Sequence, residues 1–307
     1  MTTQMTTPMG KKSGRAQPLW RSMLFVPTNV KKFIDSAPNR GADAYILDLE
    51  DSVPMAEKAN ARPLVRQAAA AIGKSGADVL VRINRPWRLM VRDIEAAVDA
   101  NVCALMVPKA ADAGHILAIA EMLDELEAER GLKIGHTRLV AMIETTAAYF
   151  HAVDIAKAHT RVVAMNLGSE DFALSAGMMP EEEGLFQPTL HVMLAARAAD
   201  ILPLGFVGTI AEYRDTKLFR ARAEQAARLG FLGSACIHPL QVDILNQAFT
   251  PSAELVTRSR GVIAAYDAAK AEGRGAIEFE GRMIDEPIIQ RAQQTIARAD
   301  MIAARQA

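Results

Sequence analysis

The sequence predicts an α/β protein of the (β/α)8 TIM-barrel class with a C-terminal helical lid segment. Two observations favour this fold. Eight short apolar runs alternate with longer helical patterns, and the 307 residues exceed the roughly 250 that one barrel uses. We therefore expect a flexible N-terminal tail over residues 1–18, a TIM barrel over 19–250 and a C-terminal helical extension, or lid, over 251–307.

The apolar runs are short, rich in Val, Ile, Leu and Ala, and bounded by Gly, Pro or charged residues, as strands are. They span residues 22–26, 44–49, 79–83, 104–107, 139–143, 161–167, 204–207 and 234–237. Between them, Ala-rich and charged stretches predict helices, among them residues 58–72, 113–130, 145–159 and 216–229. Gly230 is expected to end the last of these. Regular alternation of strand and helix favours a closed parallel barrel over an open sheet.

The residues after the eighth run exceed what a barrel requires. We predict a short helix over 239–249 and a long one over 253–271, after which Gly273-Arg274-Gly275 breaks the chain. An extended piece over 276–284 precedes a final helix over 286–304. This extension is expected to act as a lid or as an oligomer contact.

Composition excludes several kinds of partner. The formal net charge is −1 and half of the residues are hydrophobic, so nothing indicates a nucleic-acid or membrane-surface partner. No apolar run reaches the roughly 18 residues of a membrane-spanning helix. The N-terminal residues lack the apolar centre of a signal peptide, so we expect a cytoplasmic protein. Cys103 and Cys236 lie in apolar, strand-like sequence and are interpreted as reduced core thiols.

Two carboxylates lie just past the ends of neighbouring predicted strands, Glu144 after residues 139–143 and Asp171 after residues 161–167. Because the loops that follow barrel strands converge at one end of the barrel, these side chains are expected to lie close together. Mg²⁺ commonly takes one or two protein carboxylates and keeps its other positions for water and substrate. Either acid alone fits equally well as a complement to a helix dipole. Their joint placement predicts a magnesium site.

Arg82 ends the third predicted strand, and an inward-facing arginine needs an anionic partner because an unpaired buried charge is costly. Asp48 and Glu50 follow the second strand, and the period of two places both on one side of it. We expect one of them to orient Arg82 without binding the metal. For Lys109, a solvated loop residue and a site residue are equally good interpretations, and the same holds for His238.

Eight short motifs give the chain from about residue 20 to 300 a resemblance to the citrate lyase beta subunit and malyl-CoA lyase family, in the HpcH/HpaI aldolase superfamily. They occur in the family's order. The motifs are Arg21-Ser22-Met23-Leu24-Phe25-Val26-Pro27, Asp48-Leu49-Glu50-Asp51, Val81-Arg82-Ile83-Asn84, Val107-Pro108-Lys109, Ile143-Glu144-Thr145, Gly168-Ser169-Glu170-Asp171, Ile237-His238-Pro239 and Met283-Ile284-Asp285.

The resemblance implies Mg²⁺ held by Glu144 and Asp171, with Arg82 stabilising an enolate or oxyanion. It implies a lyase that cleaves a 2-hydroxyacyl-CoA, such as malyl-CoA or citramalyl-CoA, to an oxo acid and an acyl-CoA, or forms it by a Claisen-type condensation. It also implies a homo-oligomer, a trimer or a dimer of trimers. In such an oligomer the C-terminal segment caps a neighbouring barrel, and Asp285 acts there as an acid/base group. Taken alone, Asp285 is equally well explained as the cap of the final helix.

Lys31, Lys32 and Arg40 are candidates for contacts with the CoA phosphates, although a solvated helix face explains the same residues. Two positions at the mouth of the barrel depart from the family pattern, Gly205 where relatives often carry Asp and Ser234 where they carry Lys. These departures indicate a subgroup with a different substrate or a different grip on CoA. Three alternative functions stay open: a malyl-CoA-type thioesterase on the same scaffold, a CoA-independent class II pyruvate aldolase, and a binding barrel without turnover.

Overall fold

The computed structural model describes residues 17–271, 273 and 276–306. The chain divides into two compact units between Asn246 and Gln247, within helix α11 (Pro239–Ala248), and each unit is described by itself. The predicted tail over 1–18 lies outside the described residues except for its last two. Among the described residues, no helix is both long and apolar enough to cross a membrane.

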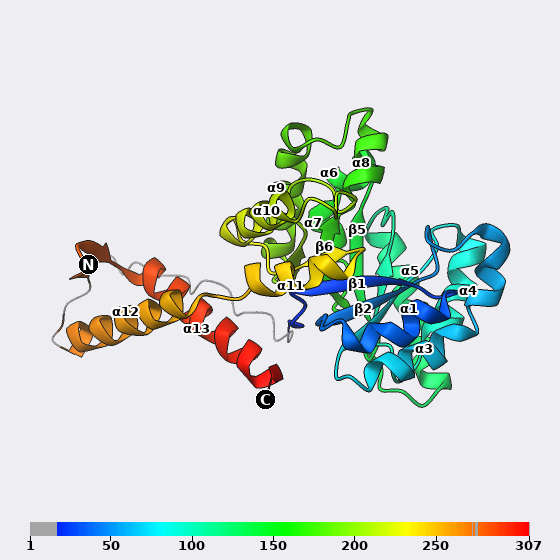
Figure 1. Ribbon diagram of the computed structural model, residues 1–307, viewed down its shortest axis with the longest axis horizontal. Helices are drawn as coiled ribbons and strands as arrows, with labels where there is room; N and C mark the ends of the chain where they lie inside the picture. The colour runs from blue at the N-terminus through cyan, green and yellow to red at the C-terminus, as the bar shows by residue number, and fades with distance from the viewer. Residues whose placement is uncertain (1–16, 272, 274–275, 307) are drawn as a thin grey trace, which may run out of the picture. The chain divides into compact units, whose positions relative to one another are not determined.

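The first unit is built on eight parallel strands (Figure 1). They are β1 (Ser22–Pro27), β2 (Ala44–Asp48), β3 (Asp78–Arg82), β4 (Ala104–Val107), β5 (Arg138–Ile143), β6 (Val162–Leu167), β7 (Leu202–Leu204) and β8 (Ser234–Cys236). Each strand from β1 to β7 pairs with the next one in the chain, and β8 pairs with β1. A parallel bridge between Leu204 and Gly233 joins the two ends of this sheet. The predicted (β/α)8 barrel is confirmed.

Helices connect the strands on the outside of the barrel (Figure 1). They are α1 (Lys31–Ser36), α2 (Lys58–Ala61), α3 (Leu64–Gly73), α4 (Trp87–Ala97), α5 (Ala113–Glu129), α6 (Thr146–Phe150), α7 (Ala152–Lys157), α8 (Ser169–Ala176), α9 (Glu182–Ala198) and α10 (Thr216–Leu229), with 3₁₀ turns η1 (Ala37–Asn39) and η2 (Met55–Glu57). Helix α10 has its predicted bounds and ends at Gly230, whose φ of 108° is left-handed.

Two of the predicted helices, over residues 58–72 and 145–159, are each split in two. Pro63 precedes α3 and lacks the N–H that a continuous helix needs, and His151 leaves the helical region between α6 and α7.

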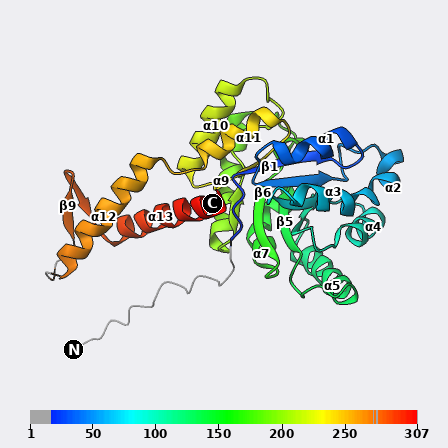
Figure 2. The same ribbon diagram turned by 60° about the horizontal axis from the view of Figure 1, so that its bottom comes forward.

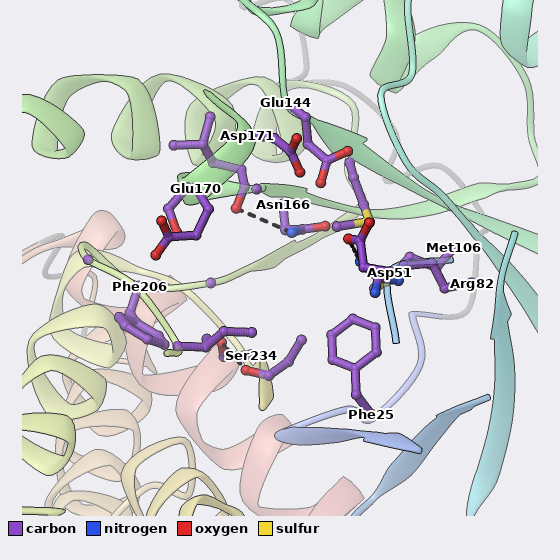
Figure 3. A pocket seen from close by; sticks show the side chains of 18 residues that line it. Phe25, Asp51, Arg82, Met106, Glu144, Asn166, Glu170, Asp171, Phe206 and Ser234 are labelled. Carbon is purple, nitrogen blue, oxygen red and sulfur yellow. Dashed lines mark hydrogen bonds and ion pairs between the residues drawn. The ribbon is translucent and has the colours of Figure 1, made fainter. Parts of the chain in front are cut away.

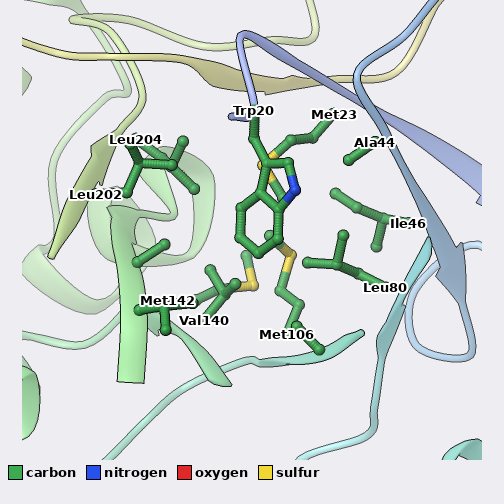
Figure 4. Packing of buried hydrophobic residues seen from close by; sticks show 13 residues of the cluster. Trp20, Met23, Ala44, Ile46, Leu80, Met106, Val140, Met142, Leu202 and Leu204 are labelled. Carbon is green, nitrogen blue, oxygen red and sulfur yellow. The ribbon is translucent and has the colours of Figure 1, made fainter. Parts of the chain in front are cut away.

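Apolar side chains that alternate along the strands fill the inside of the barrel, and Trp20 lies at the centre of this cluster (Figure 4). Trp20 is fully buried, and its indole Nε1 donates a hydrogen bond to Asp78 Oδ2 at 2.7 Å. Gly233 packs directly on the backbone of Trp20, where any Cβ would overlap the carbonyl oxygen. The barrel therefore closes at a point that only glycine fits.

The seventh strand begins earlier than the prediction of 204–207. In the structure Pro203 lies inside β7. Proline has no N–H to donate to the sheet, but its carbonyl accepts a hydrogen bond from Leu232 N at 3.0 Å. Gly205, with a φ of 121°, then ends the strand. Phe206 consequently belongs to the loop at the mouth of the barrel.

The second unit is a pair of helices with a small core of its own. Helices α12 (Ala253–Ala271) and α13 (Glu286–Gln306) lie side by side (Figure 2). The predicted extended piece is an antiparallel hairpin of β9 (Ile277–Phe279) and β10 (Arg282–Ile284). The core cluster of buried residues in this unit consists of Val262, Tyr266, Ile284, Ile289 and Ala292. Of the predicted chain break, Arg274 and Gly275 lie outside the described residues.

Candidate active site

A pocket of about 170 Å³ opens at the carboxyl ends of the barrel strands. All eight strands, or the loops that follow them, contribute to its lining, which is why its residues are scattered along the sequence. Glu144, Asp171 and Asn166 lie on one side, and Phe25 and Ser234 lie on the other (Figure 3). The two acids predicted to bind a metal therefore line the same pocket.

Glu144 sits in a tight cradle directly after β5. Its side chain is buried, and Oε2 accepts a hydrogen bond from the backbone N–H of Lys109 at 2.7 Å. Gly168 passes so close that a Cβ at this position would overlap the Glu144 carboxylate. Burial, and then the nearby carboxylate of Glu50, raise the pKa of Glu144 to about 7. The fold thus fixes this carboxylate where its negative charge is poorly compensated.

Lys109 contacts three acidic side chains, each of which follows a different strand. Its ammonium Nζ lies 3.1 Å from Asp171 Oδ1 and 3.5 Å from Glu50 Oε1, while its backbone binds Glu144. Lys109 has a φ of 47°, a left-handed conformation that is uncommon for a residue with a side chain and often marks a functional site. The lysine whose role the sequence left open therefore belongs to the site.

Arg82 is held by carboxylates from the end of β2. Nε and Nη2 donate to the two oxygens of Asp48, each at 2.7 Å, and Nη1 donates to Asp51 Oδ2 at 3.1 Å. Nη1 also lies 2.9 Å from Glu50 Oε2, but out of line for a hydrogen bond, so this contact is electrostatic. The guanidinium stacks over the Phe25 ring, 4.7 Å from its centroid. A contact with either Asp48 or Glu50 was expected, and Arg82 contacts both.

Acids outnumber cations around the pocket. Arg82 and Lys109 face six carboxylates, those of Asp48, Glu50, Asp51, Glu144, Glu170 and Asp171. Burial raises the pKa of Glu50 to about 7 despite the neighbouring Arg82. Carboxylates packed this densely repel one another, and a divalent cation would relieve that repulsion.

The donor atoms fit Mg²⁺ better than zinc. Among the described residues, no group of three or more His, Cys, Asp or Glu side chains is arranged to hold a metal ion. Glu144 and Asp171 supply two carboxylates, and the buried Oδ1 of Asn166 accepts no hydrogen bond in the described part of the chain. Two carboxylates, an amide oxygen and water make a typical oxygen set for Mg²⁺. The residues present therefore fit this ion.

Four other predicted site residues are not among the residues that line the pocket. Lys31, Lys32 and Arg40 are exposed on α1 and after η1, and Lys31 forms an ion pair of 2.6 Å with Asp35. Asp285 is exposed in the second unit, directly before α13. The roles proposed for these four residues stay predictions.

Several lining residues were not singled out from the sequence. Phe25 and Asn166 lie two residues beyond the core residues Met23 and Ala164, so strand periodicity offered a signal for both. Phe206 lies in the loop after β7, where no periodicity applies.

Comparison with known proteins identifies the family. Residues 21–239 match the sequence model described as HpcH/HpaI aldolase/citrate lyase. Citrate lyase subunit beta of Leuconostoc mesenteroides subsp. cremoris is 32% identical over 285 residues, which cover 92% of this chain and 94% of that protein. L-malyl-CoA/beta-methylmalyl-CoA lyase of Cereibacter sphaeroides is 33% identical over 307 residues, covering 92% and 96%.

Solved structures agree with this result. The crystal structure of CitE from Mycobacterium tuberculosis, in complex with magnesium, acetoacetate and coenzyme A, is 28% identical with a TM-score of 0.68 and covers 93% of this chain and 99% of that one. The relatives in sequence are named as lyases, and the fold, the motifs and the family match agree. The chain belongs to the HpcH/HpaI aldolase/citrate lyase family.

Proposed function

We propose that this protein is a Mg²⁺-dependent lyase that cleaves, or forms, a carbon–carbon bond in the CoA thioester of a 2-hydroxy acid, such as malyl-CoA, in which the hydroxyl lies β to the thioester carbonyl. The observation that carries the proposal is the placement of Glu144 and Asp171 opposite the anchored Arg82 at the mouth of one barrel. The names of the lyase relatives support the reaction class. The CitE complex with magnesium and coenzyme A supports the cofactor and the thioester.

Glu144 and Asp171 would hold the metal ion, with the side-chain oxygen of Asn166 beside them. Bound Mg²⁺ would supply Lewis-acid stabilisation of negative charge on the oxygens at the oxo-acid end of the substrate. Glu144 would need no rearrangement, because the Lys109 N–H and the close approach of Gly168 already fix its carboxylate. A preorganised site of this kind avoids a reorganisation cost during the reaction.

Arg82 would offset the charge of the thioester enolate that cleavage releases. Its hydrogen bonds to Asp48 and Asp51 leave one N–H on each terminal nitrogen for a substrate oxygen. Asp48 fixes the plane of the guanidinium, so these donors keep one direction. Cleavage removes the proton of the substrate hydroxyl, and Asp285 is the proposed acid/base group that accepts this proton and returns it to the enolate carbon.

The family resemblance supports the remaining parts of the proposal. Asp285 would reach the site of a neighbouring subunit in a trimer or dimer of trimers, with the C-terminal helices as its lid. Lys31, Lys32 and Arg40 would contact the CoA phosphates. A cytoplasmic location completes the proposal.

The test is product analysis by mass spectrometry. The protein and Mg²⁺ are incubated with a panel of CoA thioesters of 2-hydroxy acids that includes malyl-CoA and citramalyl-CoA. We expect a shorter acyl-CoA and an oxo acid. Free CoA with the intact hydroxy acid would instead establish a thioesterase. Cleavage of the free hydroxy acids without CoA would establish an aldolase, and no turnover of any compound would favour a binding barrel.

A further inference from the structure

We propose that the pocket selects a substrate whose cleavage releases a monocarboxylic 2-oxo acid, and that it discriminates against a dicarboxylic one. This inference rests on the proposed function and adds the class of oxo acid. In a monocarboxylic oxo acid such as glyoxylate or pyruvate, the group beyond the carbonyl is hydrogen or alkyl. In oxaloacetate this group ends in a second carboxylate, which the pocket would have to bind.

The charges that line the pocket disfavour a second carboxylate. In the described part of the chain, Arg82 is the single cation in the lining, against four acids, Asp51, Glu144, Glu170 and Asp171. Three carboxylates already surround Arg82, and its remaining N–H groups are assigned to the enolate oxygen, so it leaves no cation for a second carboxylate. A carboxylate placed here would lose its hydration without gaining an unpaired cation.

Two other cations close to lining residues, Lys109 and Arg222, are also engaged. The ammonium of Lys109 lies between Asp171 and Glu50, at 3.1 and 3.5 Å. Arg222 lies beside Gly208 of the lining and forms an ion pair of 2.6 Å with Glu212. Neither cation offers its charge to the pocket without breaking an existing ion pair.

The wall opposite the metal-binding acids is apolar. It consists of Phe25 from β1, Phe206 and Ile210 from the loop after β7, and Ala235 from β8. Ser234 is the polar side chain on this wall, and its hydroxyl donates to the Ala235 carbonyl at 3.0 Å (Figure 3). A methyl or ethyl group fits such a wall, because its burial removes apolar surface from water and leaves no polar atom unpaired.

The experiment compares two oxo acids of nearly equal size. Calorimetric titration of the full-length, Mg²⁺-loaded protein measures the Kd of 2-oxobutyrate and of freshly prepared oxaloacetate, in which a carboxylate replaces the terminal methyl. No acyl-CoA is present, so binding is read without turnover. We expect 2-oxobutyrate to bind at least about tenfold more tightly. Equal binding, or tighter binding of oxaloacetate, would overturn the inference.

Ser234→Lys supplies the converse test, because it places an ammonium on the apolar wall. This variant is expected to shift the ratio of the two Kd values towards oxaloacetate by at least about tenfold. Ile210→Lys introduces the same charge at a less buried position of the wall and keeps the test valid where Ser234→Lys does not fold. Ser75→Lys adds a lysine at the exposed, opposite end of the barrel and should leave the ratio unchanged.

Failure of this inference is distinguishable from failure of the proposed function. Lyase products in the mass-spectrometric assay, together with tighter binding of oxaloacetate, would refute the inference alone. If neither oxo acid binds and no lyase product forms, the proposed function fails and the inference fails with it.

Discussion

Asp48 and Arg82 are register partners on adjacent parallel strands, and both oxygens of Asp48 accept 2.7 Å hydrogen bonds from the same guanidinium. Burial alone would raise the pKa of Asp48, but the hydrogen bonds and charge of Arg82 prevail and lower it. The acid is therefore ionised and holds Arg82 in one orientation. Removing either residue of such a buried pair is strongly destabilising, because the charge of the other residue stays buried without a partner.

Arg82→Ala should lower kcat/KM by roughly 100- to 1,000-fold, the usual cost of losing a donor that stabilises developing negative charge. Arg82→Lys should recover only part of this loss, because an ammonium cannot bind both oxygens of Asp48 in a planar fork. Steady-state kinetics on the thioester that the product assay identifies would measure both. Arg66→Ala, at an exposed arginine of α3, is the control. Near-normal turnover by a folded Arg82→Ala protein would contradict the role.

Glu144→Gln and Asp171→Asn should each weaken Mg²⁺ binding by at least about tenfold, because each replaces a carboxylate ligand with a neutral amide. Glu170→Gln makes the same charge change in the same pocket. Glu170 Oε1 instead accepts a hydrogen bond from Thr209, so this variant should bind Mg²⁺ within a few-fold of the unaltered protein. Isothermal titration calorimetry distinguishes the three. Equal weakening in all of them would mean that only the summed charge of the pocket matters.

Gly168→Ala tests the cradle around Glu144. The new methyl group would overlap the carboxylate, so Glu144 has to move and Mg²⁺ affinity should fall. The free energy of unfolding should also decrease, by about 1–3 kcal/mol, as in other overpacked sites. Gly73→Ala is the matched control, since a Cβ there meets no atom within 4 Å. It should leave Mg²⁺ binding unchanged in the same calorimetric and urea-denaturation measurements.

Asp285 can be tested by complementation between subunits. Asp285→Asn and Arg82→Ala should each be nearly inactive alone. If Asp285 acts on a neighbouring barrel, co-expressed chains carrying one change each will form some sites with both residues intact. We expect mixed oligomers to recover a measurable share of kcat, with each variant expressed alone as the control. Mixed oligomers no more active than the two parents would place Asp285 outside the neighbouring site.

The sequence predicted the barrel because strands buried on both faces appear as continuous apolar runs, and connections long enough for helices separate them. It brought Glu144 and Asp171 together because Glu144 directly follows β5 and Asp171 lies in the first turn of the helix after the neighbouring strand β6. The position of Lys109 was not predictable, since it depends on a left-handed backbone conformation in a loop. The prediction that Phe206 lies in a strand was wrong, because the turn at Gly205 that ends β7 leaves no periodic signal in the sequence. Loop geometry therefore limited the prediction of the site more than the fold did.

Glu127 on α5 offers a stability test remote from the pocket. Its carboxylate is fully buried, and both oxygens accept hydrogen bonds from Arg161, at 2.8 and 2.6 Å. The backbone N–H groups of Thr137 and Gly135 donate to the same carboxylate at 2.6 and 2.7 Å. Burial alone would raise the pKa of Glu127, but these hydrogen bonds prevail and lower it below 4.5.

A carboxyl whose pKa is lower in the folded state binds protons more readily in the unfolded state. Glu127 therefore contributes stability above about pH 4.5, and this contribution is lost as the pH falls through its folded pKa. Glu127→Gln should lower the free energy of unfolding by about 3–5 kcal/mol at pH 7, because Arg161 loses its buried counter-charge. The difference from the unaltered protein should shrink as the pH falls below about 4.5. Urea denaturation across this range measures it, with Glu129→Gln, exposed on the same helix, as the control for net charge. A difference that stays constant with pH would show that packing, rather than ionisation of Glu127, stabilises this end of the barrel.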